Sequence, residues 1–159
     1  MNIRHLLLDT FAYMPPAHIL GDLSEADAMQ RACGNVHSIA EIVAHIGFWQ
    51  DWLLHRCRGE GVPMAQRAAE GWPVVPDGSW FGLRDGFLNG LREAAEMGDD
   101  QARLQESLAP AIEFPPLASY TIADALVHVA AHNAHHLGQI ITLRQIMGKW
   151  PPTSGSWTW

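Results

Sequence analysis

Four histidines fall within nine residues of an otherwise apolar stretch, HVAAHNAHHLGQIITLRQIMG. Two of them, His132 and His136, are four residues apart, so on a helix they lie one turn apart on the same face. Neutral imidazole nitrogens at this spacing commonly bind zinc and other divalent metal ions. Metal binding is therefore the first chemistry that the sequence suggests.

Both histidines fall on the line of residues expected to face the core of a helical bundle. Spacings of three and four place on this line Ile122, Ala125, Val129, His132, His136, Gln139, Leu143 and Ile146. In the segment SIAEIVAHIGFWQDWLLHRCRG the corresponding line runs through Ile42, His45, Trp49 and Trp52. Each imidazole could be an ordinary core histidine with a neighbouring partner. An unpaired buried polar group costs about 1–3 kcal/mol, however, so one divalent ion shared by His45, His132 and His136 is the favoured explanation.

The remaining histidines offer alternatives. His128 lies four residues before His132, so these two could instead form the ligand pair. His128 and His136 are about 12 Å apart along a helix axis, too far to share an ion easily, and His136 is favoured because His128 falls beside the core line. His135 is expected on the flank, in a surface or supporting role. Ordinary surface or interface positions are expected for His5, His18, His37 and His55.

The segments that carry these residues have the pattern of helices. The pattern is helical from Asn2 to Tyr13, and a brief helix follows Ser24. Capping-box spacings open two long helices, at Ser38 with Glu41 and at Thr121 with Asp124. Another helix is expected after Ser79, which can cap it, and the last should run from Ile122 to about Met147, before Gly148 and two prolines. We therefore predict one all-α domain over residues 1–159, a four-helix bundle with a long loop over residues 60–78 between the second and third helices. One turn of helix is expected in this loop, around residues 64–69.

Composition narrows the possible partners and compartment. The chain has 159 residues, 48% of them apolar, and a formal net charge of −7. This acidity argues against nucleic acid as a partner. Two cysteines far apart in sequence favour a reduced, cytoplasmic setting over a disulfide scaffold, and no stretch is long enough to span a membrane.

Other chemically capable residues are weaker candidates for the site. Glu41 lies one turn before His45 and could act as a general base, although its capping role is favoured. Asp51 is expected in solvent and Asp124 in a cap. Cys57 lies too far along the helix from His45 to be a ligand or nucleophile. Trp49 and Trp52 are expected in the core beside the site. The tail carries Trp150, Trp157 and Trp159, and should fold back on the bundle or cross to a partner subunit.

Taken together, these motifs resemble the DinB-like family of metal-binding four-helix bundles, which is grouped with maleylpyruvate isomerases and thiol-dependent transferases. The segment HSIAEIVAHIGFWQDW is similar to the family's second helix, and AAHNAHHLGQIITLRQIMG to its fourth. The resemblance implies that His45, His132 and His136 are the ligands, that the helix order is unusual and that the protein is a homodimer. It implies no single reaction.

Our leading hypothesis is a metal-dependent enzyme, a thiol-dependent transferase or a hydrolase, acting on a small-molecule substrate. The ion would be zinc, nickel or iron, and the resemblance adds a low-molecular-weight thiol as a second cofactor. Three neutral histidines leave a coordination position open, as in catalytic zinc sites. The rival hypothesis is a non-catalytic metal-binding or stress-response module whose ion holds the helices together. A nucleic-acid-binding damage-response protein is a third possibility, disfavoured by the acidic charge.

Overall fold

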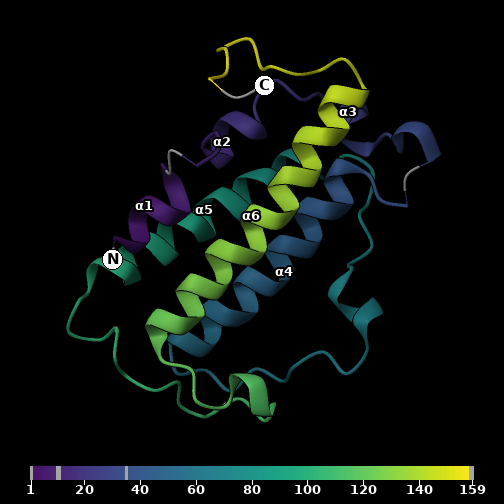
Figure 1. Ribbon diagram of the computed structural model, residues 1–159. Helices are drawn as coiled ribbons and strands as arrows, with labels where there is room; N and C mark the ends of the chain where they lie inside the picture. Colours follow the sequence, from purple (N-terminus) through teal and green to yellow (C-terminus); the bar gives the residue numbers. More distant parts are fainter. Residues whose placement is uncertain (1, 10–11, 35, 158–159) are drawn as a thin grey trace.

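The computed structural model of the chain describes residues 2–9, 12–34 and 36–157, without the side chain of Cys33 (Figure 1). The described elements are, in chain order, α1 (Ile3–Leu8), α2 (Pro16–Ile19), α3 (Glu25–Met29), η1 (Ala32–Gly34), α4 (Ile39–Cys57), η2 (Ala68–Gly71), α5 (Trp80–Asp99), η3 (Pro115–Leu117) and α6 (Ile122–Ile146). These residues form no strand, and only an isolated bridge joins Ser107 to Thr121. The predicted all-α class is confirmed.

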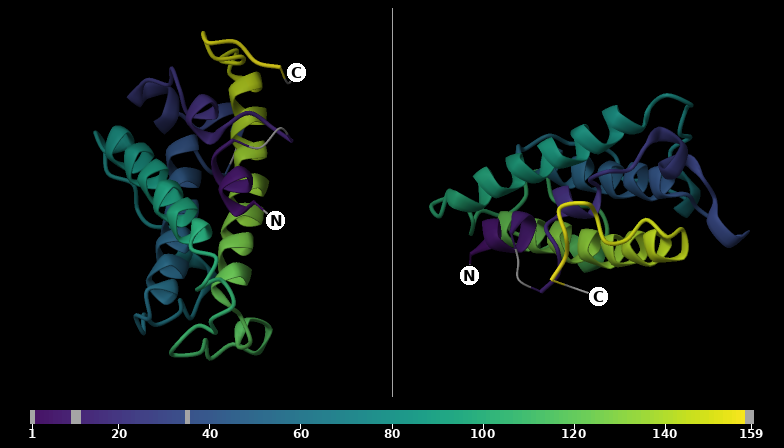
Figure 2. Two further views of the ribbon diagram at one scale, coloured as in Figure 1. Left: turned by 90° about the vertical axis from the view of Figure 1, so that its left-hand side faces the viewer. Right: turned by 90° about the horizontal axis from the view of Figure 1, so that it is seen from above.

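Three long helices and the short α1 form the bundle. α4 packs against both α5 and α6, and α1 packs against the same two helices from the other side. α4 and α6 lie side by side along their length, while α5 crosses behind them (Figures 1 and 2). The bundle thus has two helices near the ends of the chain and two from its middle. The short helices α2 and α3 pack against α6, α4 and α5 at one end.

The predicted caps hold for the two site-bearing helices. Ser38 and Glu41 form a reciprocal capping box at the start of α4, and Thr121 and Asp124 form another at the start of α6. Each box satisfies two backbone N–H groups that otherwise have no intrahelical partner. α6 ends at Ile146, and Gly148 follows with a φ of 67°, the left-handed conformation expected of a glycine after a helix.

The cap predicted at Ser79 is wrong. The Ser79 side chain makes no capping bond to α5 and instead donates to the carbonyl oxygen of Pro76. The carboxylate of Glu25, from α3, accepts from the N–H groups of Gly78 at 2.8 Å and Trp80 at 3.2 Å. A tertiary contact therefore replaces the local cap, and it joins α3 to the start of α5.

The first helix is shorter than its apolar pattern predicted. α1 ends at Leu8, because Asp9 has left the helical conformation, and residues 10–11 lie outside the described part of the chain. Pro15 and Pro16 follow the apolar pattern in the sequence, and Pro16 is the first residue of α2, a position that tolerates the missing N–H.

The tail folds back on the bundle, which is one of the two alternatives predicted from the sequence. Trp150 packs against the core under the guanidinium of Arg144, and the N–H and hydroxyl of Thr153 both donate to Asp22 at 2.6 Å. Trp157, by contrast, is 55% exposed, so the folded-back tail covers Trp150 but not Trp157. Trp159 lies outside the described residues.

The core line predicted along α6 holds only in part. Most of its members are buried, but Gln139 and Ile146 are exposed. A strict heptad drifts by about 20° per repeat relative to a straight α-helix, and α6 is also enclosed by α1, α2, α4 and α5. Residues off the line are therefore buried as well, including Leu126, Asn133, Leu137, Ile140 and Arg144.

A buried polar network joins the three long helices. The side-chain amide of Gln50 on α4 donates to the carbonyl oxygen of Phe87 on α5 at 3.0 Å. The same amide accepts at 2.9 Å from Asn133 on α6. Gly90 gives Gln50 its room, because a Cβ at that position would lie 2.3 Å from the Gln50 nitrogen.

The connection between α4 and α5 runs over the surface of the bundle as a long loop, as predicted. Its single described helical turn, η2, lies slightly later than the turn expected around residues 64–69. The side chains of Val62, Met64, Trp72 and Val75 pack partly buried against the core. In the ranges that the structure describes, none of the helices combines the length and the hydropathy needed to cross a lipid bilayer.

Candidate metal centre

Three imidazoles from two helices converge between α4 and α6. One nitrogen each of His45, His132 and His136 lies within 4.8 Å of the other two. His45 and His136 are buried, and His132 is half-buried. Nitrogen ligands bind zinc at about 2.0–2.1 Å, so donors this close can share an ion after side-chain adjustments of about an ångström. The sequence expectation that these rings meet in the bundle is confirmed.

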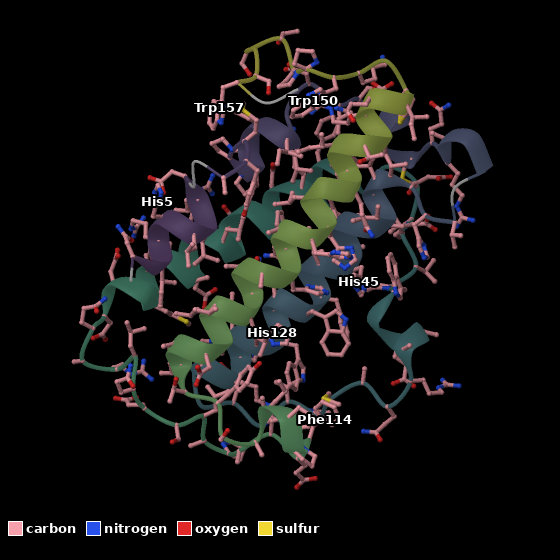
Figure 3. The ribbon with its side chains drawn as sticks, viewed as in Figure 1. His5, His45, Phe114, His128, Trp150 and Trp157 are labelled. Atoms are coloured by element: carbon pink, nitrogen blue, oxygen red, sulfur yellow. The ribbon has the colours of Figure 1, made fainter. Side chains whose placement is uncertain are left out.

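The loop after α4 holds His45 in place. Its Nδ1–H donates to the carbonyl oxygen of Gly71 at 2.6 Å, which leaves Nε2 with a free lone pair. Trp72 stacks on the same ring with centroids 3.9 Å apart, and His37 stacks on the other face of Trp72 at 3.8 Å. Figure 3 shows His45 on the side of the bundle that η2 covers. The loop thus fixes both the tautomer and the orientation of this histidine.

A side chain on α6 plays the same part for His136. Nδ1 of His136 lies 2.8 Å from Oε1 of Gln139, an oxygen that can only accept, so the proton is on Nδ1. Nε2 is again left free. Hydrogen bonds of this kind to the second ring nitrogen are the usual support of a metal-binding histidine, because they fix the tautomer and raise the basicity of the ligand.

Burial keeps the three rings neutral. The pKa of His132 is lowered to about 4, first by burial and then by the neighbouring imidazoles of His136 and His45. Burial is also the main reason that the pKa values of His45 and His136 are lowered, although their hydrogen bonds to Gly71 and Gln139 act in the opposite direction. Neutral imidazole is the form that binds a metal ion.

Acidification should destabilise the metal-free protein through His132. Its pKa is about 4 in the folded chain against an ordinary 6.5, so between these values the unfolded chain holds a proton that the folded chain does not. The contribution of neutral His132 to the free energy of unfolding is fully present above the ordinary pKa of 6.5. It is lost as the pH falls toward the folded-state pKa of about 4. Because His132 is only half-buried, solvent weakens this effect, and we expect it to account for a loss of about 1 kcal/mol in the free energy of unfolding between pH 7 and 5, measured by urea unfolding with a chelator present. His132→Asn, which cannot titrate, should lose less of its free energy of unfolding over this pH range. The same pH dependence of stability in the variant and the wild type would contradict the prediction.

Comparison with the families of known proteins gives a match. Residues 16–140 match the sequence profile of the DinB superfamily. The chain belongs to the DinB superfamily. No curated protein and no solved structure matches it. The three-histidine group of this DinB chain lies within the matched residues, so the family assignment and the site concern the same part of the molecule.

The two other histidines of α6, His128 and His135, do not belong to the three-histidine group. His128 is outside the group of three, with its ring 6.4 Å from that of His132 and its Nδ1 3.1 Å from the hydroxyl of Tyr120. His136, not His128, therefore shares the centre with His132. His135 is exposed beside the centre, with its ring 4.9 Å from His136 and its Nε2 3.4 Å from the Gln139 amide.

Glu41 is a cap in the DinB fold and not a base at the centre. Burial raises its pKa, but hydrogen bonds from Arg31 and from the backbone of Ser38 outweigh burial and leave the pKa below its ordinary value. A carboxylate that is ionised and held by these two partners is not free to accept a proton from a bound substrate. Asp124 is likewise a cap, and Asp51 is exposed and pairs with His55.

Cys57 takes no part in the centre. Its thiol is buried, and burial raises its pKa to about 11, so it is neither a thiolate nucleophile nor a ready ligand. Of the histidines expected at the surface, His55 pairs with Asp51 and Glu60, and His5 pairs with Asp9. His37 differs from the expectation, because it packs against Trp72 beside the centre.

Sequence reasoning missed the groups that orient the three converging histidines. Gly71 and Trp72 lie in a loop whose path no periodicity predicts, although the glycine before a tryptophan in GWPVVP could have suggested a close backbone approach. A Cβ at Gly71 would lie 2.6 Å from Nε1 of Trp49. The predicted core line includes Gln139, but this residue is exposed, and the line does not predict its bond to His136.

Proposed function

We propose that this DinB protein binds one divalent metal ion through His45, His132 and His136 and is a metal-dependent enzyme, a thiol-dependent transferase or a hydrolase. The observation that carries the proposal is the convergence of three imidazole nitrogens from two helices within 4.8 Å. Nδ1 of His45 and Nδ1 of His136 are engaged by Gly71 and Gln139, so Nε2 of each ring is left as a donor to the ion. Three nitrogen donors suit zinc, nickel or iron.

The arrangement favours a reactive ion over one that only holds the helices together. A divalent ion bound by three neutral nitrogens keeps its full charge and an open position, where it can lower the pKa of a bound water or thiol. Structural zinc sites usually have four protein ligands, and no cysteine or carboxylate joins the three histidines among the described residues. The apolar core extends from Ile3 to Leu143 through all four bundle helices, which supports a fold that does not need the ion.

Metal titration tests this proposal. Protein stripped with a chelator and then dialysed against zinc or nickel is expected to hold one ion per chain by elemental analysis. Removing the ion should leave the far-ultraviolet circular dichroism of the helices unchanged and lower the melting temperature only through lost ligand binding. Absence of bound metal would refute the proposal. Unfolding on chelation would instead support the structural alternative.

Gly71→Ala is expected to lower zinc affinity by about 10–100-fold, the usual consequence of losing a group that orients a ligand. The new Cβ would lie 2.6 Å from Nε1 of Trp49, so the loop must shift and carry the carbonyl away from His45. Competition with a chromophoric chelator measures the affinity. Gly61→Ala, in the same loop, is the control, because its Cβ would meet only the side chain of Pro110, at 3.3 Å. Equal affinities in the two variants would contradict a role for Gly71.

A further inference from the structure

An apolar cavity of about 240 Å³ adjoins the metal centre. Six apolar side chains line it: Trp49, Trp52 and Leu53 from α4, Met64 from the following loop, and Phe114 and Leu117 from the segment before α6. His132, one of the three converging histidines, and His128 complete the wall. In Figure 3, His128 lies between His45 and Phe114 along the bundle. A molecule in this cavity would therefore touch a ligand of the proposed ion.

None of the residues lining the cavity has a carboxylate, ammonium or guanidinium group. The polar end of Trp52 is already used, because its Nε1–H donates to the carbonyl oxygen of Pro63 at 3.0 Å. His128 is bonded through Nδ1 to the hydroxyl of Tyr120. A charged group placed here would lose its hydration without gaining an opposite charge, whereas an apolar group would lose only unfavourable contact with water.

Two other large cavities have charged residues in their lining. The cavity between α4 and α5, of about 530 Å³, includes Asp51 and Glu93 and none of the three converging histidines. The cavity on the flank of α6 touches His132 but also includes Asp124. A cavity of about 340 Å³ beside His37 and Gln139 also lacks charged residues, but none of the three converging histidines lines it. Of these four cavities, the apolar one combines an uncharged lining with a converging histidine.

We propose that the apolar cavity binds the uncharged part of the substrate, a group about the size of one substituted aromatic ring, while an attached donor atom reaches the metal centre. An apolar cavity of about 150 Å³ is large enough for benzene, so 240 Å³ leaves room for a ring with a short substituent. This inference rests on the proposed function and adds the substrate class. Small dicarboxylates and other multiply charged molecules are excluded from this cavity.

The first experiment uses metal-free protein, so it tests the cavity alone. The probes are toluene and benzoate, and the reporter is the ¹³C-labelled methyl group of Met64, assigned with Met64→Leu. Toluene is expected to shift this signal at concentrations at least tenfold lower than benzoate. Leu117→Trp, which fills the cavity, should abolish the shift. Leu88→Trp, another partly buried leucine packed on the core, should keep it. No toluene shift, or equal binding of benzoate, would overturn the proposal.

The second experiment connects the cavity to the ion. In cobalt-loaded protein, thiolate binding is followed by its near-ultraviolet charge-transfer band, with phenylmethanethiol compared with ethanethiol. The aromatic thiol should bind at least tenfold more tightly, and Leu117→Trp should reduce that preference to less than threefold. Equal affinities for the two thiols would overturn the link between cavity and centre. If toluene binds but no cobalt is retained, the metal proposal fails while the apolar preference of the cavity is supported.

Discussion

Single replacement of His45, His132 or His136 by alanine is expected to abolish stoichiometric metal binding. Each ring supplies one of three donor nitrogens that lie within 4.8 Å of one another. Loss of a direct ligand should exceed the roughly 10–100-fold loss of affinity that follows from removing a supporting group. Elemental analysis after gel filtration, with zinc competition against a chromophoric chelator, measures both stoichiometry and affinity.

The matched controls are His135→Ala and His128→Ala on the same helix. His135 is exposed beside the centre, and His128 is bonded to Tyr120 and lies outside the group of three. Both variants should retain one ion per chain. Undiminished metal content in His45→Ala and His136→Ala would show that the ion, if bound, has other ligands. Circular dichroism of each variant separates loss of the ion from loss of the fold.

Gly90→Ala is expected to destabilise the fold while leaving the metal centre untouched. Its Cβ would lie 2.3 Å from the Gln50 nitrogen, so the Gln50 amide must leave its place. The amide then loses its bonds to Phe87 and Asn133, which join α4 to α5 and α6. Leaving these buried groups without partners should lower the free energy of unfolding by about 2–3 kcal/mol, measured by urea unfolding.

Gly86→Ala, one helical turn earlier on α5, is the control for Gly90→Ala. Nothing lies within 4 Å of its Cβ position, so the change should affect only backbone entropy. Alanine is favoured over glycine inside a helix by about 0.5–1 kcal/mol, and this variant should be slightly more stable than the wild type. Similar stabilities for the two variants would contradict the close packing assigned to Gly90.

Local features of the fold could be predicted from the sequence because their hydrogen bonds are local. The capping boxes at Ser38 and Thr121 need only residues three positions away, and both are present. The cap at Ser79 could not be predicted, because the group that replaces it, Glu25, comes from another helix. The end of α1 at Leu8 was not predictable either, because no proline or glycine marks it in the sequence.

The candidate site was predictable where helix geometry determines it. The core lines of two helices brought His45, His132 and His136 together, and the structure confirms their convergence. The groups that orient them were not predictable to the same degree. Gly71 and Trp72 depend on the path of a loop, which follows from tertiary packing and not from the spacing of apolar residues. The thiol, the homodimer and the cytoplasmic location stay predictions.

The role of the loop after α4 has a consequence for how such a protein can diversify. His45 is positioned by Gly71 and Trp72, which belong to a surface connection and not to the bundle. Surface connections accept substitutions, insertions and deletions more readily than packed helices. Selection could therefore retune how firmly an ion is held, or which side of it is reachable, by editing this one segment. The reactivity of the bound ion could then change while the helical bundle stays the same.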